Sequence, residues 1–230
     1  MDETGIRSVG VDRASAWIGE GWALFKRAPG LWIAILVIYF VIAIVAGLIP
    51  VVGSLAFSLF APVFTYGFLA GARDLDAGQA LKIEHLFAGF SSPRLGSLVV
   101  LGVLSLVVGV GLALVAGFGL AGAFAGAADG GGGLLTLLVM LVVLLVMLVL
   151  IAALFFATPL VGFAGTGPVD AVKLSFAATI RNWLPLLVWG LIGLVLTFVG
   201  SIPFGLGLLV VVPLLTASYW CVCRDVLGVS

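Results

Sequence analysis

The densest group of reactive side chains in this sequence follows an apolar stretch that ends near residue 72. The group comprises Arg73, Asp74, Asp76, Lys82, Glu84 and His85. Two carboxylates at i and i+2 with a Glu-His pair are ligand types suited to a divalent cation, and the guanidinium could hold a lipid phosphate. The alternative, which we favour, is a set of ion pairs between side chains that snorkel to the membrane boundary. The chain has one histidine, so a multi-histidine metal site within one chain is excluded.

The composition defines the elements that must position this group. Hydrophobic residues make up 63% of the chain and charged residues 9%, and the mean hydropathy is +1.39, far from a globular domain with about 25% charged residues. The sequence therefore predicts an integral membrane protein. Its ten basic and ten acidic residues cancel, so no overall charge points to nucleic acid as a partner.

Length identifies six predicted spans, because a membrane helix is apolar on all sides. They are Leu31 to Leu48, Val51 to Ala72, Leu95 to about Ala125, Leu134 to about Phe163, Trp183 to Gly200, and Phe204 to Val222. No stretch shows the alternation of a membrane β-strand. We expect an all-α membrane protein with a loose polar tail over residues 1–12 and a single membrane domain over residues 13–230.

The basic residues predict the orientation. All ten fall in the N-terminal segment, the C-terminal segment, or the connections that lie on the same side as these. The opposite connections contain no Lys or Arg and, among acids, only Asp129. By the positive-inside rule we expect both termini to face the cytoplasm.

A repeat links two of the spans. From Pro62 the chain reads PVFTYGFLAGARDLD, and from Pro213 it reads PLLTASYWCVCRD. In both, a threonine (Thr65 or Thr216) follows the proline by three residues, and Arg-Asp (Arg224-Asp225 in the second) closes the stretch. Eleven helical residues rise about 16 Å, which places the proline near the middle of the bilayer and the Arg at its boundary.

The repeat extends to three units, over about residues 13–76, 77–167 and 168–230. Each has a short amphipathic segment (14–26, 81–90 and 169–181) and then a helical hairpin whose second span contains a proline. In the middle unit this proline is Pro159, and eleven residues after it stands Asp170, where the other two copies place Arg73 and Arg224. The glycines and proline that follow Pro159 could end its span early, which would move Pro159 toward the cytoplasmic side. The first amphipathic segment is predicted to lie on the membrane surface, with tryptophans at the headgroup level.

Small residues predict close helix packing. Gly67 and Gly71 form a GxxxG pair, and a longer ridge repeats every four residues: Ser105, Gly109, Ala113, Gly117, Ala121 and Ala125. We favour packing within the monomer, and the alternative is a homo-oligomer or protein partner at this ridge.

The spans offer little chemistry. None contains Asp, Glu, His, Lys or Arg in its interior, whereas ion-coupled transporters normally carry such residues inside the membrane. The threonines near the prolines are expected to bond to neighbouring carbonyls. We therefore expect no catalytic, cofactor or metal site, and membrane lipids as the principal contacts.

The run FTYGFLAGARDLDAG, then LKIEHLFAGF and RLGSL, and the closing SYWCVCRDVLG resemble an uncharacterised family of bacterial six-helix inner-membrane proteins. More distantly, the chain is similar to the membrane domain attached to some glycerophosphodiester phosphodiesterases. The resemblance implies an architecture, together with a bacterial inner-membrane location, and supplies no catalytic residues. With one histidine in 230 mostly apolar residues, we do not expect a soluble catalytic barrel in this sequence.

Three classes of function follow. The first is a non-enzymatic scaffold or partner-binding and lipid-interacting component. The second is a lipid- or solute-handling protein, which a cavity reaching Thr65 and Thr216 would favour. The third is an enzyme that uses the group from Asp74 to His85.

Overall fold

The computed structural model describes residues 5–128 and 133–229, and within them every regular secondary-structure element is a helix. The α-helices are α1 (Arg13–Arg27), α2 (Pro29–Gly47), α3 (Val52–Asp76), α4 (Leu95–Ala128), α5 (Gly133–Phe155), α6 (Ala157–Gly162), α7 (Pro168–Arg181), α8 (Trp183–Ser201) and α9 (Leu208–Leu227). A short 3-10 helix, η1, covers Ile83–Phe87. The all-α prediction is confirmed, while Asp129 lies outside the described residues.

Six segments of the described chain are long and apolar enough to cross a membrane. They correspond one to one with the predicted spans. The last span starts at Leu208 instead of Phe204. Here residues 202–207 form a turn in which Phe204 and Gly205 both have positive φ, at 52° and 79°, so the chain reverses before the helix begins.

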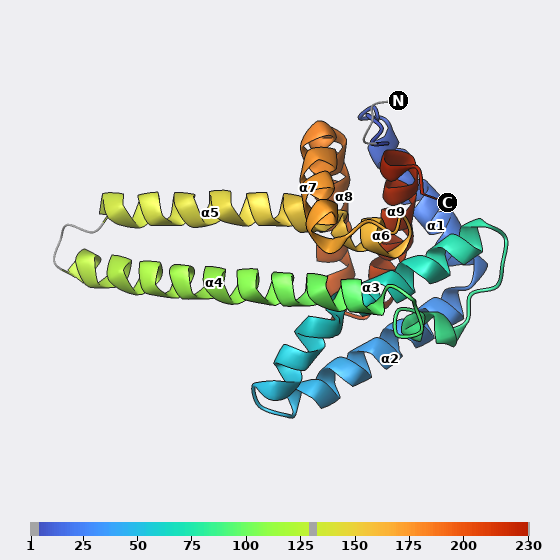
Figure 1. The fold of residues 1–230 in the computed structure, drawn as a ribbon, viewed down its shortest axis with the longest axis horizontal. Helices are drawn as coiled ribbons and strands as arrows, with labels where there is room; N and C mark the ends of the chain where they lie inside the picture. The colour runs from blue at the N-terminus through green and yellow to red at the C-terminus, as the bar shows by residue number, and fades with distance from the viewer. Residues whose placement is uncertain (1–4, 129–132, 230) are drawn as a thin grey trace.

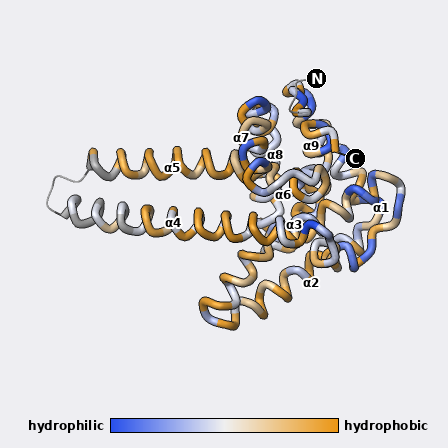
Figure 2. The backbone as a smooth tube through the Cα atoms, viewed as in Figure 1, coloured by the Kyte–Doolittle hydropathy of each residue, from blue (hydrophilic) through white to orange (hydrophobic). Residues whose placement is uncertain are grey.

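The spans form three hairpins, α2 with α3, α4 with α5, and α8 with α9, that spread from a common base (Figure 1). Hydrophilic residues gather near this base, close to both ends of the chain, and the hairpins are mainly hydrophobic (Figure 2). The α4–α5 hairpin projects beyond the rest of the body. Because α4 has 34 residues, or about 51 Å of helix, it exceeds a hydrocarbon core of about 30 Å unless it tilts.

The fourth predicted span is broken at Phe156, between α5 and α6. Ser175 of α7 inserts there: the Phe156 N–H donates to Ser175 Oγ (2.8 Å), which donates to the Ala152 carbonyl (3.1 Å). The side chain thus replaces the backbone bond that would join residues 156 and 152. Pro159 follows the break in α6, which ends at Gly162, so the span does not run straight to Phe163.

The N-terminal tail is held against the body over its described part, where the sequence predicted a loose segment. The Arg7 N–H donates to the Val226 carbonyl (2.8 Å). Asn182, buried between α7 and α8, accepts from the Val9 N–H and donates to the Arg7 carbonyl, both at 3.0 Å. A buried amide satisfies backbone groups that would otherwise lack partners, and this fixes residues 7–9.

Helix α1 contacts protein through its apolar face. Trp17, Leu24 and Phe25 are buried, and at Gly21 an added Cβ would lie 2.6 Å from the backbone nitrogen of Ser218 in α9. The small residue therefore allows the two helices to meet closely. The position of α1 relative to the membrane surface stays a prediction.

Small residues pack as predicted at some positions and not at others. A Cβ at Gly67 would lie 2.5 Å from the His85 carbonyl oxygen, and one at Gly71 would lie 2.6 Å from Leu81, so this GxxxG pair receives the 81–86 segment. On the long ridge, by contrast, added Cβ atoms at Gly109 and Gly117 would meet no described atom within 4 Å. Monomer packing therefore does not cover that part of the ridge.

Candidate functional site

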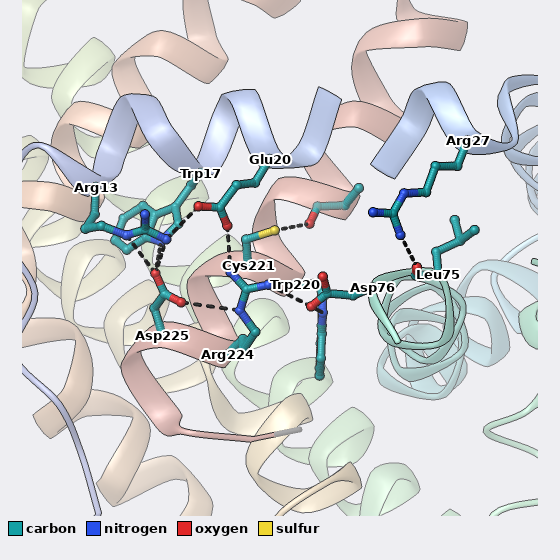
Figure 3. Close-up of polar contacts among 11 residues, drawn as sticks. Arg13, Trp17, Glu20, Arg27, Leu75, Asp76, Trp220, Cys221, Arg224 and Asp225 are labelled. Carbon is teal, nitrogen blue, oxygen red and sulfur yellow. Dashed lines mark hydrogen bonds and ion pairs between the residues drawn. The ribbon is translucent and has the colours of Figure 1, made fainter. Parts of the chain in front are cut away.

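A network of charged side chains joins α1, α3 and α9 at the base of the hairpins (Figure 3). It consists of Arg13 and Glu20 of α1, Asp76 of α3, and Arg224 and Asp225 of α9, all partly buried. Arg224 lies at the centre, with nitrogens 2.6 Å from Glu20 and 2.7 Å from Asp76. Arg13 pairs with Asp225 and, at 2.8 Å, with Glu20. The network ties the first unit of the repeat to the third.

Two tryptophans complete the network. The Trp17 indole N–H donates to Asp225 (2.9 Å) and the Trp220 indole N–H donates to Asp76 (3.1 Å). Asp225 is thus bound by a guanidinium and an indole of α1, and also by Arg224 of its own helix, while Asp76 is bound by a guanidinium and an indole of α9. Charge-assisted bonds of this kind are stronger than neutral ones, so they fix where α1 and α9 lie relative to α3.

The charged groups of this network link helices to one another. Burial alone would lower the pKa of Arg13, but hydrogen bonds from its guanidinium to Asp225 and Glu20 raise it above the usual value, so Arg13 stays charged. The nearby Cys221 thiol donates to the carbonyl of Ala217 at 3.4 Å, within its own helix. The network holds helices together and presents no activated nucleophile among these residues.

The group predicted from Arg73 to His85 is divided in the structure. Asp74 accepts from the Arg73 guanidinium (3.2 Å) and lies 2.9 Å from His85 Nε2. Asp76 instead joins the network around Arg224, and Glu84 is exposed on η1. Among the described residues, no three His, Cys, Asp or Glu side chains come together as metal ligands would.

Both nitrogens of His85 are engaged. Nδ1 lies 2.9 Å from the Lys82 backbone nitrogen and 3.0 Å from its carbonyl oxygen, while Nε2 faces Asp74. The neutral ring accepts from the Lys82 N–H, whereas the protonated ring donates to the Lys82 carbonyl. In either state His85 fastens the connection after α3 to the end of that helix.

The two matching stretches of the repeat have matching local geometry. Thr65 donates to the Ala61 carbonyl and Thr216 to the Val212 carbonyl, each at 2.9 Å. Both acceptors immediately precede a proline, as predicted for threonines near prolines. The Arg-Asp pairs also match: the Arg73 Nε lies 3.3 Å from Asp74, and the Arg224 Nε lies 3.4 Å from Asp225.

Asp170, which follows Pro159 by the same eleven residues, has no such position. It is exposed on α7 and forms a 3.6 Å ion pair with Lys173, three residues later. Helix α6 ends at Gly162 and α7 begins at Pro168, so Pro159 and Asp170 do not share one helix. The same sequence spacing therefore does not put Asp170 in the position of Arg73 or Arg224.

A cavity of about 490 Å³ lies between the proline-bearing helices. Its polar lining residues are Thr65 of α3, Thr158 of α6, Trp189 of α8, and Thr216 and Tyr219 of α9. Apolar side chains form the remaining wall: Phe68, Leu69, Leu154, Phe155, Val212 and Leu215. The two threonines marked by the repeat thus face one space.

Aromatic rings form one wall of this cavity. The Phe155 ring lies 5.0 Å from Tyr219 and 6.1 Å from Trp189 between centroids, both edge to face. The Trp189 indole N–H donates to Ser218 (2.7 Å). The Tyr219 hydroxyl donates to the Phe155 carbonyl. These contacts hold α5, α8 and α9 around the space with rigid side chains.

Sequence reasoning missed the network around Arg224 and the role of Asn182. The seven-residue spacing of Arg13 and Glu20 on α1 was a signal for one charged face, but their partners lie some 200 residues away in the chain. Such long-range pairing is not visible without the fold.

Comparisons with known proteins place the chain among membrane proteins. No family model matches it, and no solved structure matches it. A probable inner membrane protein of Burkholderia thailandensis is 32% identical over 76 residues, which is 33% of this chain and 28% of that protein. Together with the six apolar helices, this similarity supports a multi-pass inner-membrane protein.

Proposed function

We propose that this protein is a non-enzymatic component of the bacterial inner membrane that binds one lipid or another amphiphile within the bilayer. The cavity that reaches both Thr65 and Thr216 is the observation that carries the proposal. Its volume of about 490 Å³ falls within the range of about 300–1,000 Å³ that small-molecule sites occupy. Its mainly apolar wall suits an acyl chain.

The residues that line the cavity favour ligand binding over ion-coupled transport as the function. Lining residues come from α3, α5, α6, α8 and α9, so all three units of the repeat contribute to one space. None of the described lining residues is Asp, Glu, His, Lys or Arg. Proton and ion relays in membranes use Asp, Glu, His, Lys or Arg, which favours holding a neutral or apolar group.

The orientation is part of the proposal. All ten basic residues lie in the termini, in connections on one side of the six spans or, for Arg73 and Arg224, in the last turns of the spans that end on that side. The positive-inside rule then places the base of the hairpins, with the network around Arg224, in the cytoplasm.

A protein partner or second copy stays a prediction for the outer part of α4. The open positions at Gly109 and Gly117 would admit another helix backbone. Native mass spectrometry of protein extracted in mild detergent counts subunits and bound lipids in one measurement. A monomer with one bound lipid would exclude a second copy at α4 and would agree with lipid binding in the cavity.

A cavity-filling variant tests the function. Val212 lines the cavity, so Val212→Phe should displace the ligand and lower the amount of copurified lipid after delipidating washes. Val195 of α8 is 61% exposed, and Val195→Phe adds the same ring on the outer surface as a matched control. Equal lipid content in the wild type and both variants would refute binding in this cavity.

A further inference from the structure

Four of the five polar side chains in the cavity already donate their hydrogens within the protein. The donors and acceptors are Thr65 to Ala61 (2.9 Å), Thr216 to Val212 (2.9 Å), Trp189 to Ser218 (2.7 Å), and Tyr219 to Phe155. The hydroxyl oxygens of the two threonines and the tyrosine keep lone pairs that can accept. Toward the cavity these groups therefore offer acceptors.

Thr158 is the exception. Its side chain lines the cavity, and its hydroxyl has no hydrogen-bond partner among residues 5–128 and 133–229. A helical threonine usually donates to the carbonyl four residues earlier, here Leu154, but the helix is interrupted between them at Phe156. An unpaired hydroxyl in an apolar setting is unfavourable, and a ligand atom that accepts from Thr158 would satisfy it.

The charge of the ligand follows from the lining. No Asp, Glu, Lys, Arg or His is among the described residues around the cavity. A phosphate or carboxylate headgroup placed there would lose hydration and gain no counter-ion. The polar end of the ligand must therefore be neutral.

We propose that the ligand is a neutral lipid with a free hydroxyl, of the diacylglycerol or long-chain alcohol type. Its hydroxyl oxygen accepts from Thr158, and its hydrogen is donated to one of the free lone pairs. Its chain packs against apolar residues such as Leu69 and Leu215. This assignment rests on the proposed function and names the class of molecule that the cavity selects.

Three photoactivatable probes with the same acyl chains test the assignment in nanodiscs: diacylglycerol, its deoxy analogue, in which hydrogen replaces the hydroxyl, and phosphatidic acid. We expect diacylglycerol to label peptides that line the cavity with at least about fivefold greater apparent affinity than the deoxy analogue, the worth of one net hydrogen bond. Thr158→Val should reduce this preference, because the hydroxyl then loses its donor, and Thr158→Ser should preserve it. Thr197, which donates to Gly193 at 2.8 Å in α8, gives the matched control Thr197→Val.

The outcomes separate this inference from the proposed function. Equal labelling by all three probes would overturn the inference and leave amphiphile binding intact, as would a diacylglycerol preference that Thr158→Val does not change. No labelling of the cavity by any probe would overturn both. A preference for phosphatidic acid would contradict the neutral headgroup directly.

Discussion

The hydroxyl of Tyr219 donates to the carbonyl of Phe155, the acceptor that the amide of residue 159 would use in an unbroken helix. Pro159 has no N–H to offer, so α9 supplies the missing donor to the α5–α6 segment. In a bilayer, where water cannot satisfy the carbonyl, such a bond joins the second and third units of the repeat.

Tyr219→Phe should therefore destabilise the protein by about 1–3 kcal/mol, because it leaves the Phe155 carbonyl unsatisfied. Thermal unfolding in detergent measures this as a lower Tm. In a Pro159→Ala background the restored N–H can serve the same carbonyl, and the effect of Tyr219→Phe should shrink. Equal effects in both backgrounds would contradict the account. Tyr66→Phe is the control, since Tyr66 packs against Phe163 at 4.9 Å and its hydroxyl has no partner in the described chain.

Arg224→Gln should destabilise the joint between α1, α3 and α9. The change leaves Glu20 and Asp76 without their guanidinium partner. We expect a loss of about 1–3 kcal/mol, less than for a fully buried pair because these side chains are about one-third exposed. Adding Glu20→Gln to this variant should cost less than Glu20→Gln alone. Additive effects would show that the two residues are not coupled.

Lys173→Gln is the matched control for that experiment. Its partner Asp170 and its own side chain are both mostly exposed, and exposed pairs contribute about 0–1 kcal/mol. Its unfolding temperature should stay near that of the wild type.

Substitution of two glycines of α4 by alanine should change the stability of the protein by different amounts. A Cβ at Gly102 would collide with the Leu59 carbonyl of α3, whereas one at Gly117 would meet no described atom within 4 Å. Gly102→Ala should therefore lower stability by about 1–3 kcal/mol, and Gly117→Ala should stay within about 0.5 kcal/mol. A large effect at Gly117, measured by the same unfolding assay, would show that another chain covers that face.

Reporter fusions test the orientation. A periplasm-active reporter inserted at Asp129 and one joined to the C-terminus should give opposite results, active at the first and inactive at the second. Labelling of Lys82 by an impermeant reagent added outside the cell would contradict the proposed cytoplasmic base.

The spans could be predicted from length and composition because a helix that crosses the hydrocarbon core needs about 20 mainly apolar residues. The repeat also predicted the local bonds of Thr65 and Thr216, which depend on residues within one helical turn. By contrast, the break at Phe156 depends on Ser175, which comes from another helix. The predicted span therefore continued through it.

The candidate site was predicted only in part for the same reason. Asp74 and His85 meet because one short connection brings them together. The assignment of Asp76 to Arg224 required knowing that α3 and α9 lie side by side, which local spacing does not reveal. The cavity likewise depends on how the hairpins spread, so the sequence could name two of its threonines without showing Thr158.

Mapping of lipid adducts tests the central claim most directly. Cells are grown with a photoactivatable fatty acid, the protein is extracted and delipidated, and light is applied before peptide mass spectrometry. The account predicts retained adducts on segments 65–69, 154–158 and 212–219, which line the cavity, and their loss in Val212→Phe. Adducts found only on the outward faces of α2, α4 and α8 would contradict it.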